Sequence, residues 1–113
     1  MCAPNSAHAS AMTRIEVAPR ARTDLVDIET YLKREAGVRR TKVVLRRIRD
    51  RIDRLQEFPK LGVEREDYGG RHVLQCKPYI AIYRVRRVGP DTLVIILRIV
   101  HGARDIPTLL EGA

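Results

Sequence analysis

The chain has 113 residues, with 22 Lys and Arg against 14 Asp and Glu, so its formal net charge is +8 and its pI is about 10.2. A chain of this length makes one domain around a single hydrophobic core, and the apolar share of 44% is ordinary for such a domain. The positive charge favours acidic partners, whether nucleic acid, an acidic protein or an anionic surface, and it says little about the fold.

Cysteine usage and hydropathy exclude several classes of protein. Cys2 and Cys76 belong to no CxxC or Cys/His cluster, so neither a disulfide scaffold nor a structural zinc site is expected. No apolar run reaches the 18 or so residues of a membrane span, and residues 1–13 lack the features of a signal peptide. We expect a cytoplasmic protein without metal, cofactor or membrane partner.

The N-terminal residues predict a tail and a short strand. Residues 1–13 are small and polar without periodicity, which indicates a disordered extension before one domain over residues 14–113. Residues 14–18 alternate between polar and apolar side chains, which predicts an edge strand that ends at Pro19.

Two amphipathic helices are predicted next. Apolar residues recur at helical spacing in both: Leu25, Ile28 and Leu32 in the first, and Val44, Ile48, Ile52 and Leu55 in the second. Asp24 is expected in the first turn of the first helix, which ends at Gly37 as a C-cap. The second helix runs from about residue 39 to 58 and ends before Pro59. Because the connection is very short, the two helices should be antiparallel neighbours.

Three further strands are predicted over residues 71–77, 79–86 and 93–101, separated by turns at Pro78 and at residues 88–91. Short turns favour an antiparallel meander, to which the N-terminal strand adds a fourth member. Residues 106–110 suit only a short C-terminal helix. The predicted fold is α+β, a two-helix antiparallel hairpin packed on a small antiparallel sheet, in the order β-α-α-β-β-β.

The last strand is almost wholly aliphatic and ends in polar residues. Alternation puts one set of side chains on one face, Val94, Ile96, Arg98 and Val100, and puts Ile99 and His101 on the other. The side chains of Arg98 and His101 are therefore not expected to contact each other. A buried guanidinium needs a partner, for which Asp105 and Asp67 are the candidates.

Eight of the basic residues lie within 16 positions: Arg39, Arg40, Lys42, Arg46, Arg47, Arg49, Arg51 and Arg54. One interpretation is a solvated helix face with i,i+4 ion pairs such as Arg46–Asp50 and Arg49–Asp53. The other is a surface for phosphate or an acidic partner. The residues expected to bind a partner are Arg39, Arg46, Arg47, Arg49 and, near the C-terminus, Arg104.

No nucleotide-binding, metalloprotease or nucleophile-elbow motif is present. The one catalytic alternative is a metal-free RNA-cleaving site, with arginines to stabilise the phosphorane and a histidine as base or acid. Its residues would be Arg71, Arg84, Arg98 and His101. A single histidine at a strand end is more often structural, so no catalytic residue is assigned.

Several segments together resemble the RelE/ParE superfamily of bacterial type II toxins over about residues 14–110. They are DLVDIETYL at residues 24–32, L-x-x-F-P-x-x-G at 55–62, GRHVL at 70–74, YIAIYRV at 79–85 and ILRIVHGARD at 96–105. The closing HGARD resembles the ParE-like, plasmid-stabilisation branch.

The resemblance implies a small α+β toxin that a cognate acidic antitoxin wraps. RelE-like members cleave mRNA on the ribosome, whereas ParE-like members act on DNA gyrase without being nucleases. The nuclease branch typically carries a tyrosine near its C-terminus, but here Gly102 follows His101 and no tyrosine occurs after Tyr83. We therefore expect a gyrase-directed toxin that a ParD-like antitoxin neutralises. The alternative is a RelE-like, ribosome-dependent mRNA endoribonuclease, and direct nucleic-acid binding is not expected.

Overall fold

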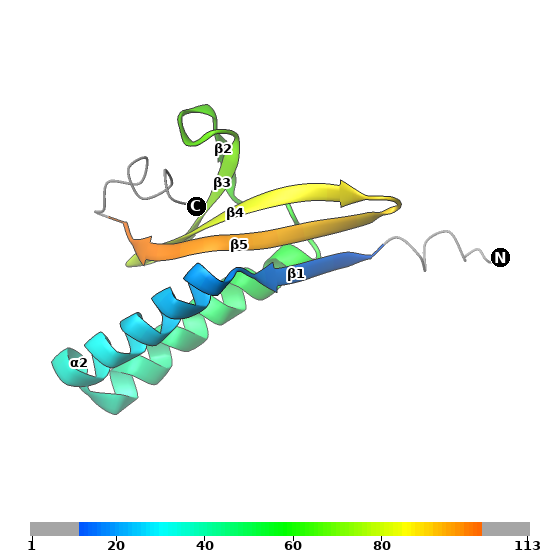
Figure 1. Cartoon of the computed structure of the whole chain (residues 1–113). Helices are drawn as coiled ribbons and strands as arrows, with labels where there is room; N and C mark the ends of the chain where they lie inside the picture. Colours follow the sequence, from blue (N-terminus) through cyan, green and yellow to red (C-terminus); the bar gives the residue numbers. More distant parts are fainter. Residues whose placement is uncertain (1–11, 103–113) are drawn as a thin grey trace.

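The structure is a computed structural model that describes residues 12–102. Its elements are β1 (Thr13–Val17), α2 (Pro19–Asp53), η1 (Arg54–Gln56), β2 (Val63–Arg65), η2 (Glu66–Tyr68), β3 (Arg71–Cys76), β4 (Tyr79–Val88) and β5 (Asp91–His101). Helix α2 covers one side of the sheet, as Figure 1 shows. The predicted extension, apart from its last two residues, and the predicted C-terminal helix lie outside the described residues, so the division at residue 14 stays a prediction.

The sheet has five strands in the order β1-β5-β4-β3-β2, and β1 runs parallel to β5 while the other neighbours are antiparallel. The predicted order and the predicted small antiparallel sheet are therefore wrong. The chain leaves β1 through α2 and returns to the far edge of the sheet, which allows a parallel pairing. Strand β2 was missed because its three residues are all exposed and carry no alternating pattern.

The prediction of two separate helices is also wrong. Helix α2 is one element from Pro19 to Asp53, interrupted only at Gly37, with φ of 86° and ψ of 169°. The chain reverses at that residue, so the two arms of α2 lie side by side (Figure 1). Glycine adopts a positive φ at little steric cost, and helical geometry resumes at once, which leaves no separate loop. Because α2 begins at Pro19, Asp24 lies beyond the first turn, contrary to the prediction.

The main core lies between α2 and the sheet. The predicted helix stripe is confirmed where it is most buried, at Ile28, Val44, Ile48, Ile52 and Leu55. These side chains pack with Leu74, Cys76, Tyr79, Ala81, Tyr83, Val94, Ile96 and Ile99 from the strands. A smaller apolar cluster of Val73, Ile80, Ile82 and Val100 lies on the opposite face, which we call the far face.

A β-bulge changes the faces of β5. Tyr83 pairs with Ile96 and Ile82 pairs with Arg98, so Leu97 is an extra residue on β5. The predicted unbroken alternation is therefore wrong, since Ile96 and Ile99 both belong to the helix-facing core. The extra residue shifts the side-chain pattern by one position, and sequence alternation alone cannot reveal it.

Candidate functional site

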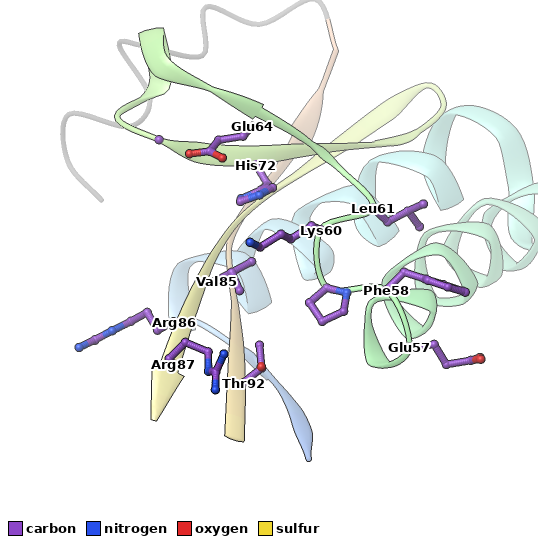
Figure 2. Close-up of a pocket in the computed structure, with 12 residues that line it drawn as sticks. Glu57, Phe58, Lys60, Leu61, Glu64, His72, Val85, Arg86, Arg87 and Thr92 are labelled. Atoms are coloured by element: carbon purple, nitrogen blue, oxygen red, sulfur yellow. The ribbon is translucent and has the colours of Figure 1, made fainter. Parts of the chain in front are cut away.

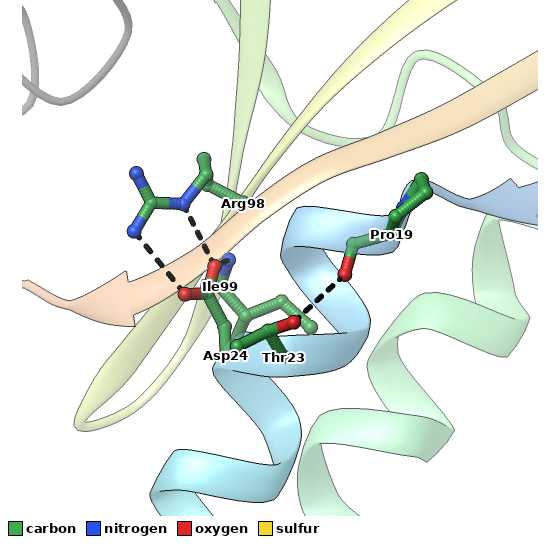
Figure 3. Close-up of polar contacts among 5 residues, drawn as sticks. All are labelled: Pro19, Thr23, Asp24, Arg98 and Ile99. Atoms are coloured by element: carbon green, nitrogen blue, oxygen red, sulfur yellow. Dashed lines mark hydrogen bonds and ion pairs between the residues drawn. The ribbon is translucent and has the colours of Figure 1, made fainter. Parts of the chain in front are cut away.

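The most buried charged contact of the described chain joins Arg98 on β5 to Asp24 on α2. Strand β1 stops pairing at Val17, opposite Ile96, and α2 brings Asp24 to the part of β5 beyond that point. The Asp24 carboxylate accepts hydrogen bonds from Arg98 Nε at 2.8 Å, from Arg98 Nη2 at 3.1 Å and from the Ile99 backbone N–H at 2.9 Å (Figure 3). Both side chains are only 8% exposed. The Asp24 carboxylate thus accepts the Ile99 N–H in place of the backbone carbonyl that a neighbouring strand would supply.

Of the two carboxylates predicted as partners of Arg98, only that of Asp67 belongs to the described residues. Asp67 is not bound to Arg98, because its carboxylate pairs with Arg65 at 2.8 Å. That contact lowers the pKa of Asp67, first through the hydrogen bond from Arg65. Asp105 lies outside the described residues. The partner that the structure shows, Asp24, was predicted only as a helix-start residue.

A cavity of about 490 Å³ opens beside this ion pair. Its polar lining includes Arg20, Asp24, Asp27, Tyr79, Arg98 and His101. The His101 ring meets Tyr79 edge-on, with centroids 5.7 Å apart. Arg98 and His101 therefore share a cavity at the end of β5.

The other two candidate nuclease residues lie elsewhere. Arg71 begins β3, half-buried, and its Nη1 donates to the Tyr68 carbonyl at 3.0 Å. Arg84 is exposed on β4. The β3–β4 register pairs His72 with Tyr83, so its continuation puts Arg71 opposite Arg84 on the far face. His72 belongs to the helix-facing side of β3, and His101 pairs with the core residue Tyr79. The two arginines and the two described histidines thus lie on opposite faces.

The basic residues of α2 are exposed along its second arm. Arg39, Arg46, Arg47 and Arg49 all lie at the surface, whereas Arg104 lies outside the described residues. Within residues 12–102, the expected ion pairs Arg46–Asp50 and Arg49–Asp53 do not form. Arg47 instead donates to the Lys77 carbonyl at 3.2 Å. The solvated-face interpretation therefore lacks the ion pairs on which it depended.

A hollow of about 610 Å³ lies on this arm, lined by Val38, Arg39, Lys42, Val43 and Arg46. Val38 is 56% exposed and Val43 is 47% exposed. Exposed aliphatic side chains among arginines are typical of a surface that an apolar and acidic partner covers.

A second polar region, which sequence reasoning missed, lies where the loop of residues 57–62 covers the sheet. Figure 2 shows this cavity, of about 870 Å³, with Lys60, Glu64, His72, Arg87 and Thr92 among its lining residues. His72 is 6% exposed and its Nδ1 has no hydrogen-bond partner among the described residues. Burial lowers the pKa of His72, and Glu64 partly opposes that shift. Only the histidine within an alternating strand could have drawn attention to the site.

The described part of the chain contains neither a membrane-spanning helix nor a metal-binding cluster of side chains. None of the helices between residues 12 and 102 is long and apolar enough to cross a membrane. The same part of the chain holds no group of three or more His, Cys, Asp or Glu side chains placed to bind a metal ion.

Comparison with known proteins agrees with the fold. One solved structure, titled "Chromosomal ParDE TA system from P. aeruginosa", superposes with a TM-score of 0.65 at 24% identity, over 80% of this chain and 96% of that chain. No curated protein sequence gives a significant match. The family model described as "ParE toxin of type II toxin-antitoxin system, parDE" matches residues 15–106. This match confirms the resemblance seen in the sequence, and the chain belongs to the ParE toxin family of type II toxin–antitoxin systems.

Proposed function

We propose that this protein is a plasmid-stabilisation type toxin that inhibits DNA gyrase and that an acidic, ParD-like antitoxin neutralises it. Membership of the ParE toxin family gives the toxin class. The related solved structure is a ParDE system, which supports an antitoxin partner for this chain as well. What we propose beyond the family is DNA gyrase as the target and a particular surface of the toxin for the antitoxin.

The separation of Arg71 and Arg84 from the two described histidines carries the choice of gyrase over RNA. Cleavage at a 2′-hydroxyl needs a proton acceptor and cationic stabilisers around one phosphate. Arg71 and Arg84 are neighbours on the far face, but His72 and His101 lie on the other side of the sheet. Arg98 is held by the Asp24 carboxylate. Among the described residues, the four candidates thus do not surround one point.

The test of the gyrase target is direct. Purified full-length toxin at micromolar concentration should reduce supercoiling by gyrase and raise the amount of cleavage complex. The same preparation mixed with its antitoxin is the control, because neutralised toxin should leave gyrase unaffected. Unchanged supercoiling and unchanged cleavage complexes with toxin alone would remove gyrase from the proposal.

The RelE-like alternative keeps one observation in its favour, the cross-strand position of Arg71 and Arg84. Primer extension on translated mRNA after toxin induction separates the two functions. We expect no new 5′ ends. New 5′ ends that disappear in Arg71→Ala but persist in Arg14→Ala, an exposed arginine on β1, would establish the ribonuclease instead.

The antitoxin contact is proposed for the hollow on the second arm of α2. Val38 and Val43 offer apolar anchors, and Arg39 and Arg46 offer positive charge beside them. An acidic helix or strand with aliphatic side chains would satisfy both kinds of group. Arg49 lies exposed on the same arm, so it extends the positive surface.

Charge reversal tests this contact. Arg46→Glu with Arg49→Glu should weaken antitoxin affinity by about tenfold or more, mainly through slower association, because steering charges act before contact. The matched control is Arg84→Glu with Arg86→Glu, which makes the same change in net charge on exposed residues of β4. Equal affinities for the two double variants would place the antitoxin elsewhere on the toxin.

A further inference from the structure

The cavity under the loop of residues 57–62 brings together hydrogen-bond donors from separate parts of the chain. Lys60 comes from the loop, His72 from β3, Arg87 from β4 and Thr92 from β5. In Figure 2 the Lys60 side chain extends from the loop into the space between His72 and Val85. Electrostatic coupling of His72 to both Lys60 and Glu64 agrees with this closeness.

These donors are not used inside the described chain. Lys60 and Arg87 form none of the ion pairs or side-chain hydrogen bonds found among residues 12–102. His72 is more than nine-tenths buried, yet its Nδ1 meets no partner there. A buried polar atom without a partner costs free energy, so this wall of the cavity carries an unsatisfied polar group.

The loop that carries Lys60 is fixed against the sheet. The Gly62 N–H donates to the buried Tyr83 hydroxyl at 2.8 Å. A Cβ atom at residue 62 would lie 2.8 Å from Tyr83 Cε1 and 2.8 Å from the Val73 carbonyl oxygen, so only glycine fits this approach. The Tyr83 ring in turn stacks on His72, with centroids 5.0 Å apart. Lys60 and His72 are therefore held by one connected set of contacts.

We infer that this cavity binds the phosphate group of a small phosphorylated molecule whose body carries hydroxyl groups, such as a sugar phosphate or a nucleoside monophosphate. Lys60, Arg87 and Thr92 supply the ammonium, guanidinium and hydroxyl donors that a phosphate dianion accepts from several directions. His72 supplies a further polar atom at the buried wall.

The acidic part of the lining determines which anionic ligands the cavity favours. Glu64 lines the same space, and Figure 2 places its carboxylate beside His72. A carboxylate there accepts hydrogen bonds from ligand hydroxyls, which the ionised side chains of an acidic peptide do not offer. The mixed lining therefore favours one phosphate on a hydroxylated body, and the site is separate from the hollow proposed for the antitoxin.

An NMR titration of the full-length ¹⁵N-labelled protein tests the inference. Inorganic phosphate, added at low and constant ionic strength against chloride, should produce saturable shift changes at Lys60, His72, Arg87 and Thr92. AMP should cause the same changes at lower concentration, because its ribose hydroxyls reach Glu64. Changes confined to residues 39–54, or no saturable change, would overturn the proposal.

Variants and other probes sharpen the result. Lys60→Glu and Arg87→Glu should each weaken phosphate binding by about tenfold or more, as expected for losing a charged donor. Arg84→Glu is the matched control on the same strand but the opposite face, and it should retain the wild-type affinity. A glutamate-rich peptide or duplex DNA that fills the cavity while phosphate and AMP do not would also refute the assignment.

Discussion

Replacing Asp24 by Asn removes one charge from the most buried ion pair of the described chain while keeping the shape of the side chain. Asp24 Oδ2 accepts from both Arg98 Nε and the Ile99 N–H, and Oδ1 accepts from Arg98 Nη2. An asparagine oxygen can keep the first two bonds. Its amide nitrogen then faces Arg98 Nη2, which places a donor against a donor.

The cost follows from burial. Both side chains are 8% exposed, so water does little to replace the lost carboxylate. Removing one partner of a buried ion pair typically costs about 3–5 kcal/mol. A domain of this size is stable by only about 5–15 kcal/mol in total. The variant should therefore lose a large part of its stability, with a melting temperature lower by roughly 12 °C or more.

Urea unfolding followed by circular dichroism measures this loss. Asp27→Asn is the matched control, because Asp27 lies one turn further along α2, is exposed, and should change stability by less than about 0.5 kcal/mol. If Asp24→Asn unfolded within about 1 kcal/mol of the control, the ion pair would not hold β5 to α2 as argued.

Three other predictions concern the loop, the histidine and the cysteine. Gly62→Ala should destabilise the chain by about 1–3 kcal/mol, because its Cβ would overlap Tyr83 and the Val73 carbonyl; an unchanged urea midpoint would contradict that contact. Burial lowers the pKa of His72 below 6.5, so the unfolded chain binds more protons and stability should fall as pH drops from 6.5 toward the folded pKa. His72→Gln should lack this dependence, and identical urea midpoints against pH for the two proteins would refute it. Burial raises the pKa of the Cys76 thiol to about 11, so iodoacetamide at about pH 8 should modify it only after unfolding, as peptide mass spectrometry can show.

Local periodicity explains what the sequence could predict about the fold. The strands at residues 14–18, 71–77, 79–86 and 93–101 were located within two residues at each end, because each is an alternating or aliphatic run next to a clear turn signal. The buried helix positions followed from 3.6-residue spacing. The parallel pairing of β1 with β5 was missed because the choice of a neighbouring strand leaves no pattern in the local sequence. The edge strand β2 was missed because three residues are too few to show alternation.

The candidate site was harder to predict because its contacts join distant residues. Arg98 was expected to need a carboxylate, yet the choice of Asp24 depends on where β1 ends against β5. The bulge at Leu97 shifts the faces of β5, so Ile99 joins Ile96 in the core. Lys60 and His72 line one cavity because Gly62 lets the loop approach Tyr83. Each feature comes from tertiary packing, which a single sequence does not encode locally.

The neighbouring positions of β1 and β5 also bear on how the chain folds as it is made. Thr13 pairs with Thr92, and Asp24 meets Arg98 across 74 positions of sequence. Such distant pairings are slow to form, because a long loop must close before any contact stabilises it. During synthesis β1 has no partner strand until β5 is made. A polypeptide that stops before β5 therefore lacks both the strand neighbour of β1 and the counter-ion of Asp24, so neither contact can form until β5 has been made.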